Sequence, residues 1–237
     1  MFFAFVSCNP GASSAADSNL LPGEVIPPGE SERVAASDED IAKINAVLDL
    51  EKKNTSTTNK LVFDFGDNGK INITFENISE GVLKAVVNGQ IKIDGVVYKA
   101  DNLVLKIKIS GSDPETTIES GSMMKDGTEM SASDAYAFID SLDEENIATK
   151  DQFKEAKMLL IYKMDLLDSD NNKVGTGTMC AEITVTKDST YYVCVYDYTA
   201  DSVRVQVKVS GKADSKPTIE YAALNGKFFD EESINRL

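Results

Sequence analysis

The stretch that decides the fold is VRVQVKVSG, at residues 203–211. Apolar and polar residues alternate in it, so Val203, Val205, Val207 and Val209 share one face of a strand, and the polar residues share the other. A strand with one buried face and one wet face is typical of antiparallel sheet. We therefore expect an α+β fold that is mainly antiparallel β.

A similar stretch occurs earlier in the chain, and its surroundings recur with it. LKIKISG at residues 105–111 matches VQVKVSG at 205–211, and Thr-Ile-Glu follows both, at 117–119 and 218–220. Such self-similarity predicts a tandem duplication of a helix-plus-β-meander unit, giving two β-sheets with a short helix each. Chance similarity between alternating strands is the alternative.

Each repeat is expected to begin with a helix. The first helix covers residues 38–50 behind Ser37 as N-cap, and the second lies behind Ser131 or Ser133. In both, apolar residues recur at spacings of three and four, which predicts one packing face per helix.

Strands with period-two alternation follow each helix, with turn residues between them. Turns are expected at Asp67-Asn68-Gly69, at Asn88-Gly89 and at Asp94-Gly95. The alternation predicts strands at residues 61–65, 71–75, 103–109, 158–166, 181–185, 191–198 and 203–209.

The first residues are apolar and end at a cysteine. Phe5-Val6-Ser7-Cys8 resembles the lipobox of bacterial lipoproteins, in which a small residue precedes the cysteine that becomes lipidated. The resemblance implies export, cleavage before Cys8 and a lipid anchor in a membrane of the cell envelope. An ordinary chain end with a free Cys8 thiol is the alternative.

A tether is expected between this anchor and the folded body, because residues 9–37 are rich in Ser, Ala, Gly and Pro. The predicted organisation is a signal remnant and lipobox at 1–8, a flexible tether at 9–37, a first repeat at 38–130 and a second repeat at 131–237.

Charge and composition exclude several functions. The 39 acidic residues outnumber the 24 basic ones, giving a net charge of −15 that repels phosphate backbones, so no nucleic-acid partner is expected. The chain has no histidine, the commonest general base and a frequent metal ligand. We expect no cofactor and favour a protein that is not an enzyme.

Three tyrosines form the first candidate site. Tyr192, Tyr196 and Tyr198 alternate onto one face of a predicted strand, and exposed tyrosines are favoured at recognition surfaces. A role for these rings in core packing is the alternative.

Two cysteines on a predicted hairpin are a candidate disulfide. Cys180 and Cys194 flank a turn expected at residues 187–190, and export would permit their oxidation. Two reduced, half-buried thiols are the alternative, and two thiols without histidine predict no metal site.

A weak calcium candidate consists of Asp168, Asp170 and Asn172, which resemble the start of an EF-hand loop. Lys173 stands where that loop needs glycine, and Met179 where it needs a bidentate glutamate. A polar turn between two strands is the favoured interpretation.

The function predicted from these features is that of a cell-envelope lipoprotein, held on a membrane by its lipid anchor. It would be a non-enzymatic binding or interaction module for a protein, a glycan or a small molecule. Two alternatives are an exported hydrolase that uses carboxylates and a structural protein of envelope assembly.

Overall fold

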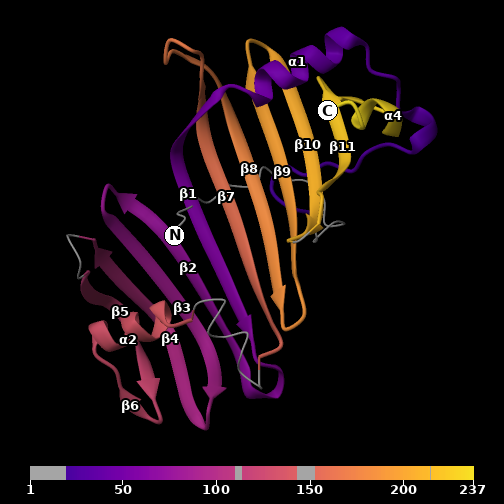
Figure 1. Cartoon of the computed structure of the whole chain (residues 1–237). Coiled ribbons are helices and arrows are strands. Elements are labelled where there is room, and N and C mark those ends of the chain that lie inside the picture. Colours follow the sequence, from indigo (N-terminus) through magenta and orange to yellow (C-terminus); the bar gives the residue numbers. More distant parts are fainter. Residues whose placement is uncertain (1–19, 110–113, 143–152, 214) are drawn as a thin grey trace. The chain divides into compact units, whose positions relative to one another are not determined.

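The computed structural model describes residues 20–109, 114–142, 153–213 and 215–237. Its strands form one open, mainly antiparallel sheet with few helices, which confirms the predicted β-rich class (Figure 1). The strand order is β12-β11-β10-β9-β8-β7-β1-β2-β3-β4-β5-β6. The prediction of two sheets is not confirmed, because one sheet holds all the strands described.

Among the described residues, the elements follow one order twice: a helix, five long strands and a two-residue strand. The helices are α1 (Asp38–Leu48), α2 (Ala132–Asp140) and α4 (Glu231–Ile234), with 3-10 turns η1 (Glu30–Glu32) and η2 (Gly66–Asn68). The first set of strands is β1 (Glu51–Asp64), β2 (Gly69–Ser79), β3 (Val82–Ile93), β4 (Val96–Lys108), β5 (Glu115–Lys125) and β6 (Thr128–Glu129). The second set is β7 (Glu155–Leu167), β8 (Lys173–Thr186), β9 (Thr190–Ala200), β10 (Val203–Lys212), β11 (Thr218–Leu224) and β12 (Lys227–Phe228).

The chain divides into two compact units, each discontinuous in sequence. Of the described residues, unit 1 contains Thr58–Leu159 and Ile183–Thr190, and unit 2 contains residues 20–57, Leu160–Glu182 and Tyr191–Leu237. The predicted repeats are continuous segments, and their limits stay a prediction.

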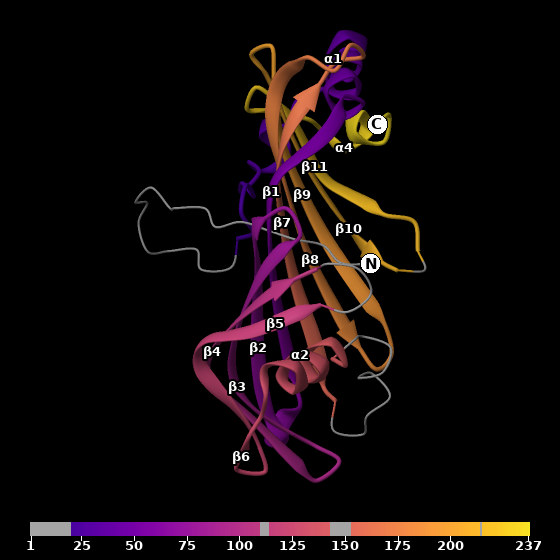
Figure 2. The ribbon, with the colours of Figure 1, turned by 90° about the vertical axis from the view of Figure 1, so that its left-hand side faces the viewer.

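Unit 1 is an antiparallel meander with one helix beside it. Its apolar core lies between the sheet and α2, which packs beside β5 (Figure 2). Ser131, one of the two predicted candidates, caps α2 by accepting a hydrogen bond from the Asp134 amide. The rings of Tyr98 and Phe138 stack with centroids 4.0 Å apart and so join the sheet to the helix.

The turn predicted at Asn88-Gly89 is wrong, because β3 continues through these residues. The ladder between β3 and β4 shifts register between Val87 and Gly89, so the pair forms an irregularity inside a strand. Gly89 has φ +114°, and a Cβ there would lie 2.3 Å from the Lys70 carbonyl oxygen of β2. Glycine is required here for close strand approach, a role that the dipeptide alone does not distinguish from a turn.

Unit 2 contains β10, the strand that the alternating stretch at residues 203–209 predicted. β10 pairs antiparallel with β9 from Val203 opposite Ala200 to Lys212 opposite Tyr191. Helix α1 lies against β10 (Figure 1). Ser37 caps α1 in a reciprocal capping box with Asp40, as the sequence predicts.

Residues 20–37 are the part of the predicted tether that the structure describes, and they belong to unit 2 and contact its other segments. The Lys208 ammonium lies 2.8 Å from Glu24, and the Val25 amide donates to the Tyr221 hydroxyl. Val34 forms a parallel bridge with Phe229, next to β12. The segment therefore runs from β10 and β11 to the edge of the sheet before α1 begins.

Candidate functional site

The three predicted tyrosines share one face of β9. Tyr192, Tyr196 and Tyr198 lie opposite Gly211, Val207 and Val205 of β10. Of the three, Tyr198 is buried, whereas Tyr192 and Tyr196 are partly exposed. We call the face that carries these rings the helix-covered face, since the end of α1 meets it.

Glycines in the two flanking strands make room for this row. A Cβ on Gly177 of β8 would lie 2.4 Å from Cδ1 of Tyr198, and a Cβ on Gly211 of β10 would lie 2.7 Å from the Tyr192 hydroxyl oxygen. Each ring therefore lies over bare backbone.

A cavity of about 240 Å³ lies on the helix-covered face. Strands β9, β10 and β11 supply its floor, and the end of α1 and the start of β1 supply its rim. Its lining is mainly apolar, with two phenols and one amine. The lining residues are Leu48, Lys52, Tyr196, Tyr198, Val207, Val209, Ile219 and Leu237.

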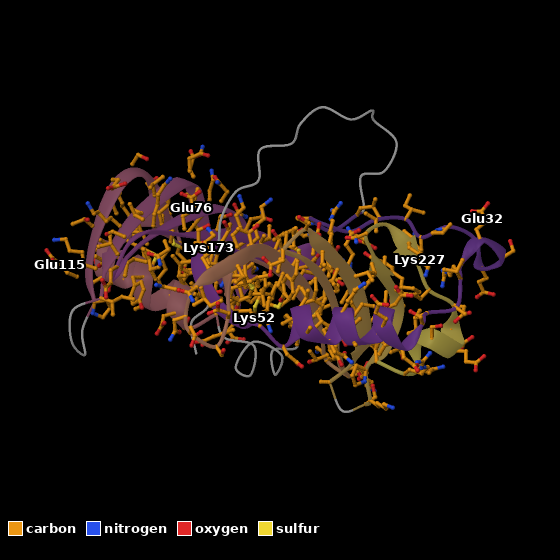
Figure 3. The ribbon with its side chains drawn as sticks, turned by 90° about the horizontal axis from the view of Figure 1, so that it is seen from above. Glu32, Lys52, Glu76, Glu115, Lys173 and Lys227 are labelled. Carbon is orange, nitrogen blue, oxygen red and sulfur yellow. The ribbon has the colours of Figure 1, made fainter. Side chains whose placement is uncertain are left out.

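Tyr198 and Lys52 are neighbouring polar residues in the lining of the cavity. The Lys52 ammonium lies 5.9 Å from the centroid of the Tyr198 ring and donates a hydrogen bond to the Leu48 carbonyl (Lys52 is labelled in Figure 3). Burial raises the pKa of Tyr198, and the neighbouring phenol of Tyr196 adds to this. The phenol therefore stays neutral and can donate or accept a hydrogen bond.

Tyr196 interacts with the thiol of Cys194. Burial, together with the neighbouring Cys194, raises the pKa of Tyr196 to about 12. Burial raises the pKa of the Cys194 thiol, and the neighbouring Tyr196 hydroxyl offsets part of this effect. Neither group ionises near neutral pH, so neither is an activated nucleophile there.

The predicted disulfide is not present in the structure, which holds Cys180 and Cys194 as thiols. Cys180 is fully buried in β8, and Cys194 is partly exposed in β9. Formation of a Cys180–Cys194 disulfide on oxidation stays a prediction.

The weak calcium candidate lies in the turn between β7 and β8. Asp168 accepts hydrogen bonds from the amides of Asp170 and Asn172, both at 2.9 Å, and from the Asn172 side chain at 3.2 Å. The bond from the Asn172 amide is the main cause that lowers the pKa of Asp168. The turn itself thus occupies both carboxylate oxygens. Over the described ranges, no three potential ligand side chains of the His, Cys, Asp or Glu type converge.

Of the residues that line this cavity, sequence reasoning named only Tyr196 and Tyr198 as candidate site residues. Leu48, Lys52, Ile219 and Leu237 come from four separate segments. The apolar stripe of α1 indicates that one face of the helix is buried, but it does not predict which strand that face contacts.

Cys8 and the lipobox lie outside the described residues. No helix in the described part of the chain is long and apolar enough to cross a membrane. Comparison with protein-family models, curated proteins and solved structures finds no match to this chain.

Proposed function

We propose that this chain is a non-enzymatic binding protein of a bacterial cell envelope, tethered to a membrane through a lipid on Cys8. Its ligand would be a small amphipathic molecule, held in the cavity on the helix-covered face of unit 2. The lipobox-like residues 5–8 support the anchor, and the chemistry of the cavity supports the ligand class.

One observation carries the ligand class: a mainly apolar cavity has a buried phenol and an amine close together in its lining. Ligand sites combine mainly apolar walls with a few placed polar groups. The phenol of Tyr198 and the ammonium of Lys52 can bind an acceptor or an anionic head group, while Val207, Val209 and Ile219 contact an apolar body. At about 240 Å³, the cavity suits a single ring or a short acyl chain.

Tyrosine fluorescence offers a direct test, because the chain contains no tryptophan to mask it. We expect octanoate to change the emission saturably and to bind more tightly than octanol, because the carboxylate can pair with Lys52. Lys52→Met should remove this preference and leave octanol binding unchanged.

A cavity-filling variant separates specific binding from general hydrophobic adsorption. Val209→Phe should abolish binding of both probes, because the added ring occupies the cavity. Val203→Phe, on the same face of β10 but outside the cavity lining, is the matched control and should bind normally. Equal binding by both variants would refute the proposed site.

The anchor is tested separately, by intact mass after expression with the native upstream sequence in a bacterium that processes lipoproteins. Cleavage before Cys8 with added acyl chains supports the proposal, and Cys8→Ala should abolish the added mass. An unmodified wild-type chain would refute the anchor but leave the cavity untouched.

We further propose that the body arose by duplication of a helix-plus-meander unit. The recurring element order supports this, since α1 and β1–β6 are followed by α2 and β7–β12. In both halves the last strand has two residues. The matching stretches occupy equivalent elements, because LKIK (105–108) lies in β4 and VQVK (205–208) in β10.

A further inference from the structure

A second hollow, of about 810 Å³, lies on the other face of the sheet in unit 2. Arg204 and Asp197 in its lining alternate with Val205 and Tyr198, so they lie on the face opposite the cavity. We call it the polar hollow. Its lining residues are Thr55, Lys163, Met164, Asp165, Lys173, Thr176, Gly177, Thr178, Asp197, Thr199 and Arg204.

The charges of the polar hollow are arranged so that cations face the solvent. Lys173 pairs with Asp165 at 2.6 Å, and Arg204 pairs with Asp197 at 2.7 Å. The cationic side chains are 55% and 51% exposed, whereas Asp165 and Asp197 are only 24% and 19% exposed. The acids therefore lie beneath the bases that they hold (Lys173 is labelled in Figure 3).

Donor capacity remains on these cations. Arg204 uses Nε and Nη2 on Asp197, which fixes the guanidinium plane and leaves Nη1 for a ligand. Among the described residues, no ion pair engages Lys163. The hollow thus has one positive charge in excess, on a chain whose net charge is −15.

Threonine side chains line the same hollow as these cations. They come from three strands: Thr55 from β1, Thr176 and Thr178 from β8, and Thr199 from β9. A hydroxyl both donates and accepts hydrogen bonds, so an array of them matches a ligand that is itself rich in hydroxyls.

From this combination we infer that the polar hollow binds an acidic oligosaccharide, whose carboxylates meet Lys163, Lys173 and Arg204 and whose hydroxyls meet the threonines. Uronic-acid chains have this alternation of anionic and hydroxyl groups. A peptide of acidic residues offers the anions without the hydroxyls, and a phospholipid surface offers a plane of anions.

Calorimetric titration of the full chain with short oligogalacturonides tests the inference. We expect saturable binding that weakens with added salt, and little binding of a neutral malto-oligosaccharide of equal length. Lys163→Gln should weaken binding about tenfold, the loss expected for one hydrogen bond to a charged group. Thr178→Val should weaken it too, without changing net charge.

Matched controls lie outside the hollow: Lys212→Gln on β10 and Thr218→Val on β11 should bind as the wild type does. Equal losses in the control and hollow variants would overturn the inference. Equal or tighter binding of polyglutamate or of phosphatidylglycerol vesicles would overturn the carbohydrate assignment. Val209→Phe should leave oligogalacturonide binding intact, so failure here is distinguishable from failure of the cavity.

Discussion

The ring of Tyr198 lies over Gly177, so close that a Cβ at position 177 would be 2.4 Å from Cδ1 of the ring. The contact joins β9 to β8 beneath one end of the cavity, and both residues are buried. It holds the phenol in place only while position 177 has no side chain.

Gly177→Ala should therefore destabilise the protein by about 1–3 kcal/mol, the range seen when a buried site is overpacked. Urea unfolding measures this loss. Gly29→Ala is the control, because nothing lies within 4 Å of a Cβ there and its φ is −55°. A loss for Gly177→Ala no larger than that for Gly29→Ala would show that the ring moves freely.

Glu24→Gln should loosen the segment that crosses unit 2 before α1. The Glu24 carboxylate lies 2.8 Å from Lys208, its side chain is only 10% exposed, and it accepts a hydrogen bond from the Leu21 amide. We expect a loss of about 1–3 kcal/mol in unfolding free energy and faster amide hydrogen exchange in residues 20–26. Glu39→Gln, which breaks an exposed pair with Lys43, should cost less than about 0.5 kcal/mol. Equal effects of the two changes would contradict the role of Glu24.

Acid should weaken the start of α1. A hydrogen bond from the Ser37 amide, followed by one from the Ser37 hydroxyl and by Lys227, lowers the pKa of Asp40 to about 2. Because the folded-state pKa is below the unfolded value, this contribution is complete above about pH 4. It is then lost as the pH falls toward 2. NMR titration of the Asp40 carboxyl should give a midpoint near 2, and Asp40→Asn should flatten the pH dependence of stability in this window. A midpoint near 3.8 would show that the capping box contributes nothing.

Alkali should destabilise the helix-covered face. Burial raises the pKa of Tyr196 to about 12, so its neutral form stabilises the fold fully below pH 10, the unfolded value. This contribution is lost as the pH rises from 10 toward 12. Absorbance titration of the phenols should show fewer groups ionising near pH 10 in the wild type than after unfolding, because burial raises the pKa of both Tyr196 and Tyr198. Tyr196→Phe should reduce the decline in stability, and Tyr191→Phe, at a 50% exposed position, should not.

The parts of the fold that sequence predicts are those set by local chemistry. Ser37 and Ser131 cap α1 and α2 as expected, since a cap depends on residues within one turn. The strand at 203–209 was readable because its apolar and polar residues alternate. The prediction that its polar face is wet is wrong at Gln206, which is buried. Most of β1 was not predicted: residues 51–60 read EKKNTSTTNK and contain no apolar residue to show the period of a strand.

The candidate site was predictable only in part, for a related reason. Alternation on a single strand puts Tyr196 and Tyr198 on one face, and the register confirms this placement. Their contact with Leu48 and Lys52 depends on which face of the sheet α1 packs against. Contacts between residues far apart in the chain decide this. No motif marks such a contact in advance.

The contacts of residues 20–36 also determine when unit 2 can fold during synthesis. The Val25 amide meets the Tyr221 hydroxyl across 196 residues of chain, and the Ala36 amide meets the Ser233 hydroxyl across 197. When the ribosome has made these early residues, their partners in β11 and α4 do not yet exist. Non-local pairing of this kind folds slowly, so we expect unit 2 to close only after β11 and α4 have been made. The apolar stripe of α1 therefore stays exposed on the nascent chain until β11 and α4 have been made.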